Sequence, residues 1–182
     1  VYKRQVCDDT LKIVFSLIEN STTLLVLDAD ALNCVAKQPE ILLKKKAPII
    51  ITPHPGEMSR LTGLATPLVN AERERVALDF AQKYGVVTVL KGAGTVIASP
   101  NGKVLVNPTG NSGMATGGSG DVLAGMTASI LAQGASAFSS AAAAVYLHGL
   151  AGDIAAEKYG KISMLPTDLI NCIPLAYKRC GF

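Results

Sequence analysis

Short apolar runs alternate with amphipathic segments through the first half of the chain. Residues 24–27, 48–52 and 86–90 are wholly or almost wholly apolar, which predicts strands buried on both faces of a sheet. Apolar positions at helical spacing predict a helix over residues 6–19. Strands separated by helices are the order that builds a mainly parallel sheet.

Further helical turns are expected from residue 31 and over residues 40–45. The clearest helix opens at Thr66 as N-cap with Pro67 at its first position, and Gly85 stands just beyond its end. The face of this helix expected to enter the core consists of Val76, Ala77, Phe80, Ala81 and Tyr84.

A hairpin and a helical tail complete the pattern. Residues 95–98 and 103–106 flank Asn101-Gly102, a dipeptide typical of a tight hairpin turn. A glycine-rich loop is expected over residues 107–120, followed by helices at about 120–133, 137–159 and 167–178. The predicted fold is therefore α/β, with a mainly parallel central sheet flanked by helices.

Three polar segments follow the predicted strands, at residues 28–33, 52–57 and 91–95. Ligands of open α/β sheets collect beyond the carboxyl ends of the strands, so we expect these segments to converge on one edge.

Composition narrows the class of protein. The 182 residues suffice for one domain, and a formal net charge of +3 without a long basic block argues against a nucleic-acid surface. Hydrophobic residues make up 49% and charged residues 17%, which excludes a disordered chain. No apolar run approaches the roughly 20 residues that span a bilayer. The four cysteines lack CxxC spacing and are expected to be reduced thiols of a cytoplasmic protein.

The segment from Asn107 to Asp121, NPTGNSGMATGGSGD, carries the strongest chemical signal. Its five glycines let backbone N–H groups approach an anion, and the helix that follows adds partial positive charge, so a phosphate is the expected guest. An aspartate beside a phosphate suggests a general base for an attacking hydroxyl. The alternative is that Asp121 is only a favourable first-turn acid and the glycines form a flexible loop.

The chain contains neither a P-loop nor the Rossmann fingerprint. The turn Lys91-Gly92-Ala93-Gly94-Thr95 leads into another strand with its backbone exposed. A lysine beside two glycines at a strand end can hold a nucleotide phosphate, although an ordinary hairpin explains the same pattern.

Two prolines restrict the backbone around His54 in the sequence TPHPGE, which suggests a positioned polar contact. A helix start is the alternative, with Pro55 at its first position and Glu57 in its first turn, and both can hold at once.

Asp28 and Asp30 follow the first predicted strand. Asp30 is a suitable N-cap, whereas Asp28 at the strand end can face a ligand or the shell of a Mg²⁺ ion. In an Ala-rich helix, we expect His148 to pack in the interior and the neighbouring Gly149 and Gly152 to allow close helix contact.

Together these segments resemble the ADP/ATP-dependent NAD(P)H-hydrate dehydratase family of the ribokinase-like superfamily, in the form of the C-terminal domain of the bifunctional repair enzyme. The resemblance covers nearly all of residues 20–175 in the family's order. It rests on LDADALN (27–33), TPHPGEMSRL (52–61), KGAGT (91–95), NPTGNSGMATGGSGDVLAGM (107–126) and HGLAGDIAA (148–156).

The resemblance implies a ribokinase-like fold and a metabolite-repair enzyme that dehydrates NADHX and NADPHX, the hydrated forms of NADH and NADPH. A nucleotide's phosphoryl group would pass to the hydroxyl of the hydrate, and phosphate would then leave. The glycine segment resembles that of the bacterial branch that uses ADP, so ADP is the expected donor, giving AMP and phosphate, with Mg²⁺ as cofactor. A homo-oligomer, a tetramer or larger at full length, is also implied, and neither nucleic acid nor membrane is an expected partner.

Residue roles carry over by position. Asp121 is implied as the base and as a contact to the hydrate, and His54 as a second contact to the hydrate. The residues implied for the adenine nucleotide are Lys91, Gly92, Ala93, Gly94, Thr95 and Gly120. The anion hole is implied for the backbone of Gly118, Ser119 and Gly120, and no metal ligand is assigned.

The chain departs from the family at its N-terminal side, where members have a further α/β section with the first strands of the sheet. Residues 1–5, VYKRQ, resemble a translated sequencing adapter, with an ordinary helix start as the alternative. Residues 6–182 are then an N-terminally truncated, partial domain. Because such a sheet has an exposed edge, we expect the fragment to be inactive and poorly soluble alone.

Two other functions stay open. A kinase of the same superfamily that acts on a small vitamin-precursor alcohol would use the same base and anion hole, and TPHPGE speaks against it. A nucleotide-binding module without catalysis is disfavoured by the presence of Asp121.

Overall fold

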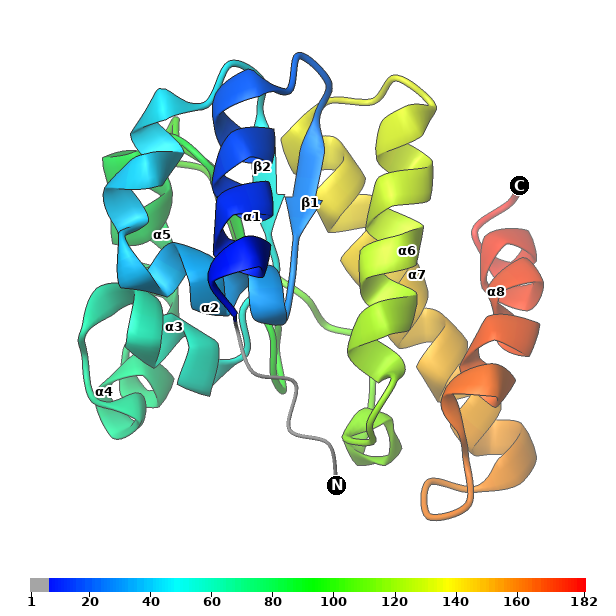
Figure 1. Ribbon diagram of the computed structural model, residues 1–182. Coiled ribbons are helices and arrows are strands. Elements are labelled where there is room, and N and C mark those ends of the chain that lie inside the picture. The colour runs from blue at the N-terminus through cyan, green and yellow to red at the C-terminus, as the bar shows by residue number, and fades with distance from the viewer. Residues whose placement is uncertain (1–6) are drawn as a thin grey trace. The chain divides into compact units, whose positions relative to one another are not determined.

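The computed structural model describes residues 7–182 (Figure 1). The expectation for residues 1–5 lies outside this range. The chain divides into two compact units. The first comprises the described residues up to Gly92 together with Val96–Leu105, and the second comprises Ala93–Thr95 and Val106–Phe182.

A five-stranded sheet holds the strands in the order β1-β2-β3-β4-β5. β1 pairs parallel with β2, β2 pairs parallel with β3, and β3 pairs antiparallel with β4. The mainly parallel sheet predicted from the sequence is thus confirmed. The predicted hairpin is confirmed by the neighbouring places of β4 and β5 in the sheet and by the Ser99 N–H, which donates to the Lys103 carbonyl at 2.9 Å. The strands are β1 (Leu25–Leu27), β2 (Ile49–Ile51), β3 (Val87–Leu90), β4 (Val96–Ala98) and β5 (Val104–Val106).

The two inner strands β2 and β3 are buried along their whole length, as their apolar runs predict. The same expectation is wrong for β1, in which only Leu27 is fully buried. The reason is position, because β1 lies at one edge of the sheet within the described part of the chain.

Helices of the first unit bury apolar faces in one core with the strands. Val14 and Ile18 of the first helix join Leu27 and Ile51 of the sheet in that core, and α5 packs on β3 and β4. These elements are α1 (Asp8–Asn20), α2 (Asp30–Lys37), the 3-10 helix η1 (Pro39–Lys44), α3 (Pro55–Thr62), α4 (Thr66–Ala71) and α5 (Arg73–Tyr84) (Figure 1).

The single helix predicted from residue 66 is wrong, because the helix is interrupted at Glu72, whose φ of −126° and ψ of 41° are not helical. The N-cap is Ala65 rather than Thr66, and no side chain caps this helix. Gly85 does end α5 in the left-handed conformation, and all five residues of the predicted core face are buried.

The second unit consists of the glycine-rich segment and a helical tail. α7 packs against both α6 and α8. None of the helices in the described part of the chain is long and apolar enough to cross a membrane. The elements are the 3-10 helix η2 (Ser112–Met114), α6 (Ser119–Ala132), α7 (Ala137–Tyr159) and α8 (Pro166–Arg179), close to the predicted bounds.

Candidate active site

The ends of β1, β2 and β3 bring the three predicted polar segments together in the first unit. The Lys91 ammonium lies 2.6 Å from Asp28 Oδ1 and 3.9 Å from Glu57 Oε2. The Lys91 N–H donates to the Pro53 carbonyl at 2.8 Å. The expected convergence on one edge of the sheet is therefore confirmed for these residues, and a lysine balanced by two carboxylates marks the point where they meet.

His54 caps α3 through its side chain. Nδ1 accepts hydrogen bonds from the N–H groups of Gly56 at 3.0 Å and Glu57 at 3.3 Å, and Glu57 Oε2 accepts from the His54 N–H at 2.8 Å. This reciprocal pair is a capping box, so the helix-start interpretation is confirmed. The imidazole is nevertheless half exposed, which leaves ring surface accessible to a ligand, while its Nε2 lies 3.4 Å from Glu57 Oε1.

The chain turns sharply after β1, at Ala29. Its φ of 50° and ψ of −118° make it the one non-glycine residue with positive φ in the described range. Ala29, and not Asp30, is the N-cap of α2, so the expected capping role of Asp30 is wrong. Such a conformation costs about 1–3 kcal/mol and is often found where a functional site requires it. Here the strained residue, Ala29, directly follows Asp28 in the chain.

A partly buried arginine supports the same edge of the sheet, and no local sequence pattern predicted it. Arg73 Nη2 donates to the Leu90 carbonyl at 2.8 Å, at the last residue of β3. Burial lowers the pKa of the Arg73 guanidinium from its ordinary value. The guanidinium therefore fixes the backbone just before the Lys91-Gly92 turn.

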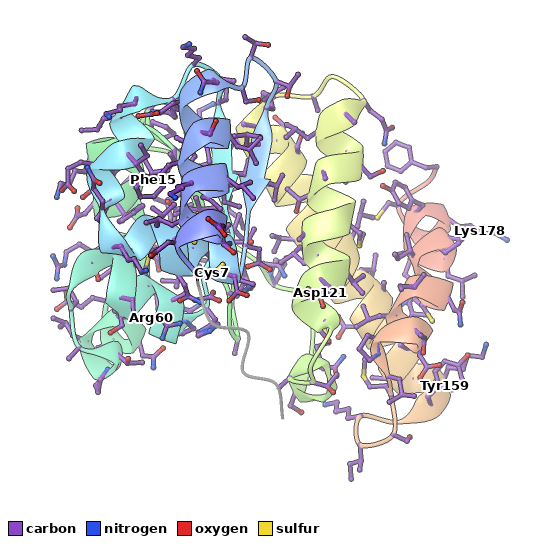
Figure 2. All side chains as sticks on the ribbon, viewed as in Figure 1. Cys7, Phe15, Arg60, Asp121, Tyr159 and Lys178 are labelled. Atoms are coloured by element: carbon purple, nitrogen blue, oxygen red, sulfur yellow. The ribbon has the colours of Figure 1, made fainter. Side chains whose placement is uncertain are left out.

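In the second unit, the glycine segment runs into α6. Gly118 is the N-cap with a φ of 100°, a conformation that favours glycine, and Asp121 follows in the first turn. Figure 2 labels Asp121 near the N-terminal end of α6, where its side chain is exposed. A helix start with an exposed carboxylate is the arrangement that the proposed base requires.

Ser119 differs from its neighbours because its hydroxyl is buried. Its Oγ has no hydrogen-bond partner within the described residues. The Ser119 N–H donates to the Thr116 carbonyl at 3.3 Å, so of its two donors the hydroxyl is the one left over. A buried hydroxyl without a partner costs free energy, and this one lies on the first residue of α6.

The predicted nucleotide turn is divided between the two units. Lys91 and Gly92 belong to the first, and Ala93–Thr95 belong to the second. Within the second unit, the Thr95 carbonyl accepts from the Asn107 N–H at 2.9 Å, which joins the end of the turn to the start of the glycine segment.

The expectations for α7 hold only in part. His148 is buried, as expected, but its Nε2 lies 2.9 Å from the Ser119 carbonyl, so it also bonds the start of α6. Gly149 and Gly152 were expected to admit another helix. Their close neighbours are instead Thr109 and Met114 of the glycine segment.

No group of three or more histidine, cysteine, aspartate or glutamate side chains in the described residues could hold a metal ion. The expected candidate, Asp28, is paired with Lys91. All four cysteines are free thiols, as predicted. Burial raises the pKa of Cys34 and Cys172, whereas a hydrogen bond from Thr10 lowers the pKa of Cys7.

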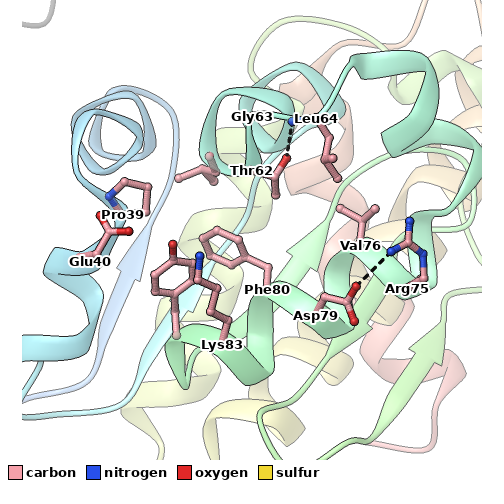
Figure 3. Close-up of a pocket in the computed structure, with 12 residues that line it drawn as sticks. Pro39, Glu40, Thr62, Gly63, Leu64, Arg75, Val76, Asp79, Phe80 and Lys83 are labelled. Atoms are coloured by element: carbon pink, nitrogen blue, oxygen red, sulfur yellow. Dashed lines mark hydrogen bonds and ion pairs between the residues drawn. The ribbon is translucent and has the colours of Figure 1, made fainter.

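A surface cavity of about 500 Å³ in the first unit contains none of the predicted site residues (Figure 3). Its charged rim includes Arg75 and Asp79, which pair with each other at 3.3 Å, and its floor includes the buried Val76 and Phe80. Its lining residues include a single glycine, Gly63, and so lack the glycine-rich backbone that phosphate binding favours.

Comparison with known proteins places these features in context. A model of the NAD(P)H-hydrate dehydratase family matches residues 7–175. The chain is 44% identical over 170 residues to the bifunctional NAD(P)H-hydrate repair enzyme Nnr of Moorella thermoacetica. The aligned region covers 93% of this chain and 32% of that protein.

Two solved structures are similar in fold and sequence. The ADP/ATP-dependent NAD(P)H-hydrate dehydratase of Bacillus subtilis, co-crystallized with ATP/Mg²⁺, has a TM-score of 0.81 and 36% identity, covering 89% of this chain and 57% of that one. A ribokinase-like superfamily protein of Enterococcus faecalis has a TM-score of 0.80 and 30% identity, and the match covers 95% of this chain and 59% of that one. The expected ribokinase-like α/β fold is thus confirmed, and the chain spans less than two thirds of each of these proteins.

Proposed function

Because this chain belongs to the NAD(P)H-hydrate dehydratase family, we propose that it carries the phosphoryl-transfer half of a nucleotide-dependent dehydratase that returns NADHX and NADPHX to NADH and NADPH. The observation that carries the proposal is the start of α6. There, Gly118 turns the chain, the Ser119 hydroxyl is buried without a partner, and Asp121 stands exposed in the first turn.

Asp121 acts as the general base. Its carboxylate takes the proton from the hydroxyl of the hydrated nicotinamide ring, and the freed oxygen attacks the terminal phosphorus of ADP. The bond from that phosphorus to the bridging oxygen breaks, and AMP leaves. The carbon–oxygen bond of the phosphorylated hydrate then breaks, phosphate departs, and a proton lost from the neighbouring carbon restores the ring's double bond.

The backbone of Gly118, Ser119 and Gly120 holds the transferred phosphoryl group. First-turn N–H groups of a helix have no partner within the helix, and the helix dipole favours negative charge at that end. These groups stabilise the charge that spreads over the phosphoryl oxygens during transfer.

The turn Lys91-Gly92-Ala93-Gly94-Thr95, with Gly120, contacts the adenine nucleotide. The Lys91 ammonium is already placed by Asp28 and Glu57, so it can meet a phosphate oxygen without first being ordered. His54 contacts the hydrated dinucleotide through the exposed surface of its imidazole.

Mg²⁺ fits this site as a companion of the nucleotide, since the described residues offer no cage of three or more ligands. Magnesium commonly binds through substrate phosphates and one or two carboxylates, and Asp28 is the carboxylate nearest to the nucleotide turn's lysine. When bound, the ion would neutralise charge on the phosphates.

Assembly and location complete the proposal. We propose a homo-oligomer for the full-length protein, and a cytoplasmic location in keeping with four free thiols. Size-exclusion chromatography with light scattering tests the first of these.

Product analysis tests the reaction. Because the chain alone is expected to be inactive, the test uses a longer protein that joins the N-terminal α/β section of the family to this chain. It is incubated with NADPHX, ADP and Mg²⁺, and NADPH, AMP and phosphate are measured together. The proposal predicts that all three appear in equal amounts. Accumulation of a phosphorylated alcohol would indicate the related kinase instead, and ADP binding without any product would indicate a module that only binds the nucleotide.

A further inference from the structure

One face of α7 lies along the glycine segment, with contacts spaced by about one helical turn. At the start of the segment, Thr109 Oγ1 donates to the Tyr146 carbonyl at 2.9 Å. Two turns further along α7, the Gly110 N–H donates to Asp153 Oδ2 at 2.9 Å, and Asn111 Nδ2 donates to Asp153 Oδ1 at 3.0 Å. Asp153 therefore uses both carboxylate oxygens to hold the first turn of the segment.

Two glycines on the same face let the segment approach. A Cβ on Gly149 would stand 2.2 Å from Thr109 Oγ1, and one on Gly152 would stand 2.3 Å from Met114 Sδ. Both distances are far below van der Waals contact. Since α7 has glycines at the two positions where the segment crosses it, the segment lies against the backbone of the helix.

The far end of the segment is held by a different residue. His148 is 8% exposed, and its Nε2 lies 2.9 Å from the Ser119 carbonyl. A carbonyl oxygen can only accept, so the imidazole donates through Nε2.

This bond has a consequence for the neighbouring amide. The Ser119 carbonyl and the Gly120 N–H belong to one planar trans peptide and point in opposite directions. Both groups lie in the first turn of α6, where the helical conformation directs the N–H toward the start of the helix. The bond from His148 to the Ser119 carbonyl is a tertiary contact that holds this turn, and with it the Gly120 N–H, in place against α7.

We propose that His148 and Asp153 are positioning residues, which hold the two ends of the glycine segment so that the Gly120 N–H points at the anion. The inference rests on the proposed function for the identity of that anion as the transferred phosphoryl group. Neither residue touches substrate. His148 sets the direction of a donor, and Asp153 sets the path of the backbone that leads to it.

Hydrogen–deuterium exchange without ligand tests the positioning itself. We expect His148→Leu to raise exchange of the amides at residues 118–122 roughly tenfold, as expected when a local opening becomes easier. His148→Gln can place an amide N–H near the position of Nε2 and should restore protection. Asp153→Ala should raise exchange at residues 110–113 instead.

Thr127→Val is the matched control, because Thr127 is also buried in the second unit and donates to the Leu123 carbonyl within α6, away from the segment. It should lower the melting temperature while leaving exchange at residues 110–122 unchanged. If His148→Leu lowers the melting temperature but leaves this exchange at the level of Thr127→Val, His148 is a packing residue and the proposal is wrong.

Kinetics with NADPHX and ADP then separate the two proposals. His148→Leu should lower kcat by about 10- to 100-fold and change the KM for ADP little. This loss is no larger than that expected when a hydrogen-bond donor to the transition state is itself removed. His148→Gln should recover most of kcat. These kinetics use the longer protein that carries the family's N-terminal section. Absence of turnover by its unsubstituted form would count against the proposed function alone, whereas the exchange result decides the positioning role.

Discussion

The Lys91 ammonium lies 2.6 Å from Asp28 Oδ1, across the ends of two strands that are 63 residues apart in sequence. Both side chains are mostly buried, at 19% and 15% exposure, and Glu57 adds a second carboxylate at 3.9 Å. Removing the lysine would leave the carboxylates of Asp28 and Glu57 without their counterion. The ion pair therefore stabilises the fold in addition to placing Lys91 at the candidate site.

Lys91→Met should lower the free energy of unfolding by about 2 kcal/mol, between the values typical of exposed and of fully buried pairs. Asp28→Asn should cost a similar amount. Because each substitution removes the same interaction, the double variant should lose less than the sum of the two. Urea denaturation of all four proteins measures this, and strictly additive losses would show that the pair is not coupled.

His54 has two separable roles, capping α3 and contacting the hydrate. His54→Ala should lower stability by about 1 kcal/mol, because the side-chain acceptor at the N-cap is lost. His54→Asn keeps an acceptor at the N-cap and should restore stability without restoring the imidazole. Thermal unfolding and NADPH recovery are measured on both variants. Full activity in His54→Asn would remove His54 from the substrate site.

The close approach of the glycine segment to α7 predicts opposite effects for two glycine substitutions. Gly149→Ala should destabilise the protein by about 1–3 kcal/mol, since its methyl group would overlap Thr109. Gly125→Ala in α6 meets nothing within 4 Å and should stabilise the protein by about 0.5–1 kcal/mol. Chemical denaturation measures both, and equal effects at the two positions would contradict the packing of the segment.

The cysteines should divide into two reactive and two protected thiols. Cys7 and Cys180 are exposed, and Cys34 and Cys172 are buried. Because the thiolate is the reactive form, the lowered pKa of Cys7 shifts its labelling to lower pH than for an ordinary thiol, and the raised pKa values of Cys34 and Cys172 shift theirs to higher pH.

Labelling with a disulfide reagent across neutral and mildly alkaline pH measures this division. Two thiols should react quickly in the native protein and all four after unfolding. Cys7→Ser should remove the phase that persists to the lowest pH. Rapid native labelling of four thiols would contradict the burial of Cys34 and Cys172.

Local patterns predicted most elements of the fold. Spacing by four residues identified the buried face of α5 from Val76 to Tyr84, and Gly85 marked its end. The break at Glu72 was not predictable, because neither glycine nor proline stands there. The break lies next to Arg73, whose guanidinium reaches the Leu90 carbonyl, a tertiary contact that leaves no trace in local sequence.

The candidate site was likewise predictable where it depends on the order of the strands, and not where it depends on contacts between distant segments. Parallel strands place their ends together, so the convergence of Asp28 and Lys91 followed from topology alone. The contact between Asn111 and Asp153 was missed, because the two residues are 42 apart in sequence and neither segment indicates that it packs on the other. The bond from His148 to Ser119 was missed because an isolated histidine in an apolar helix is usually a packing residue.

The central claim, that Asp121 is the base for phosphoryl transfer at the start of α6, is tested most directly by Asp121→Asn. NADPH recovery from NADPHX and the affinity for ADP are measured on the same preparation of the longer protein that carries the family's N-terminal section, with Asp79→Asn, an exposed aspartate on α5, as control. We predict that recovery falls by about 10²- to 10⁴-fold while the Kd for ADP changes little, because a general base acts on the transition state. Undiminished recovery, or loss of ADP binding in place of loss of turnover, would contradict it.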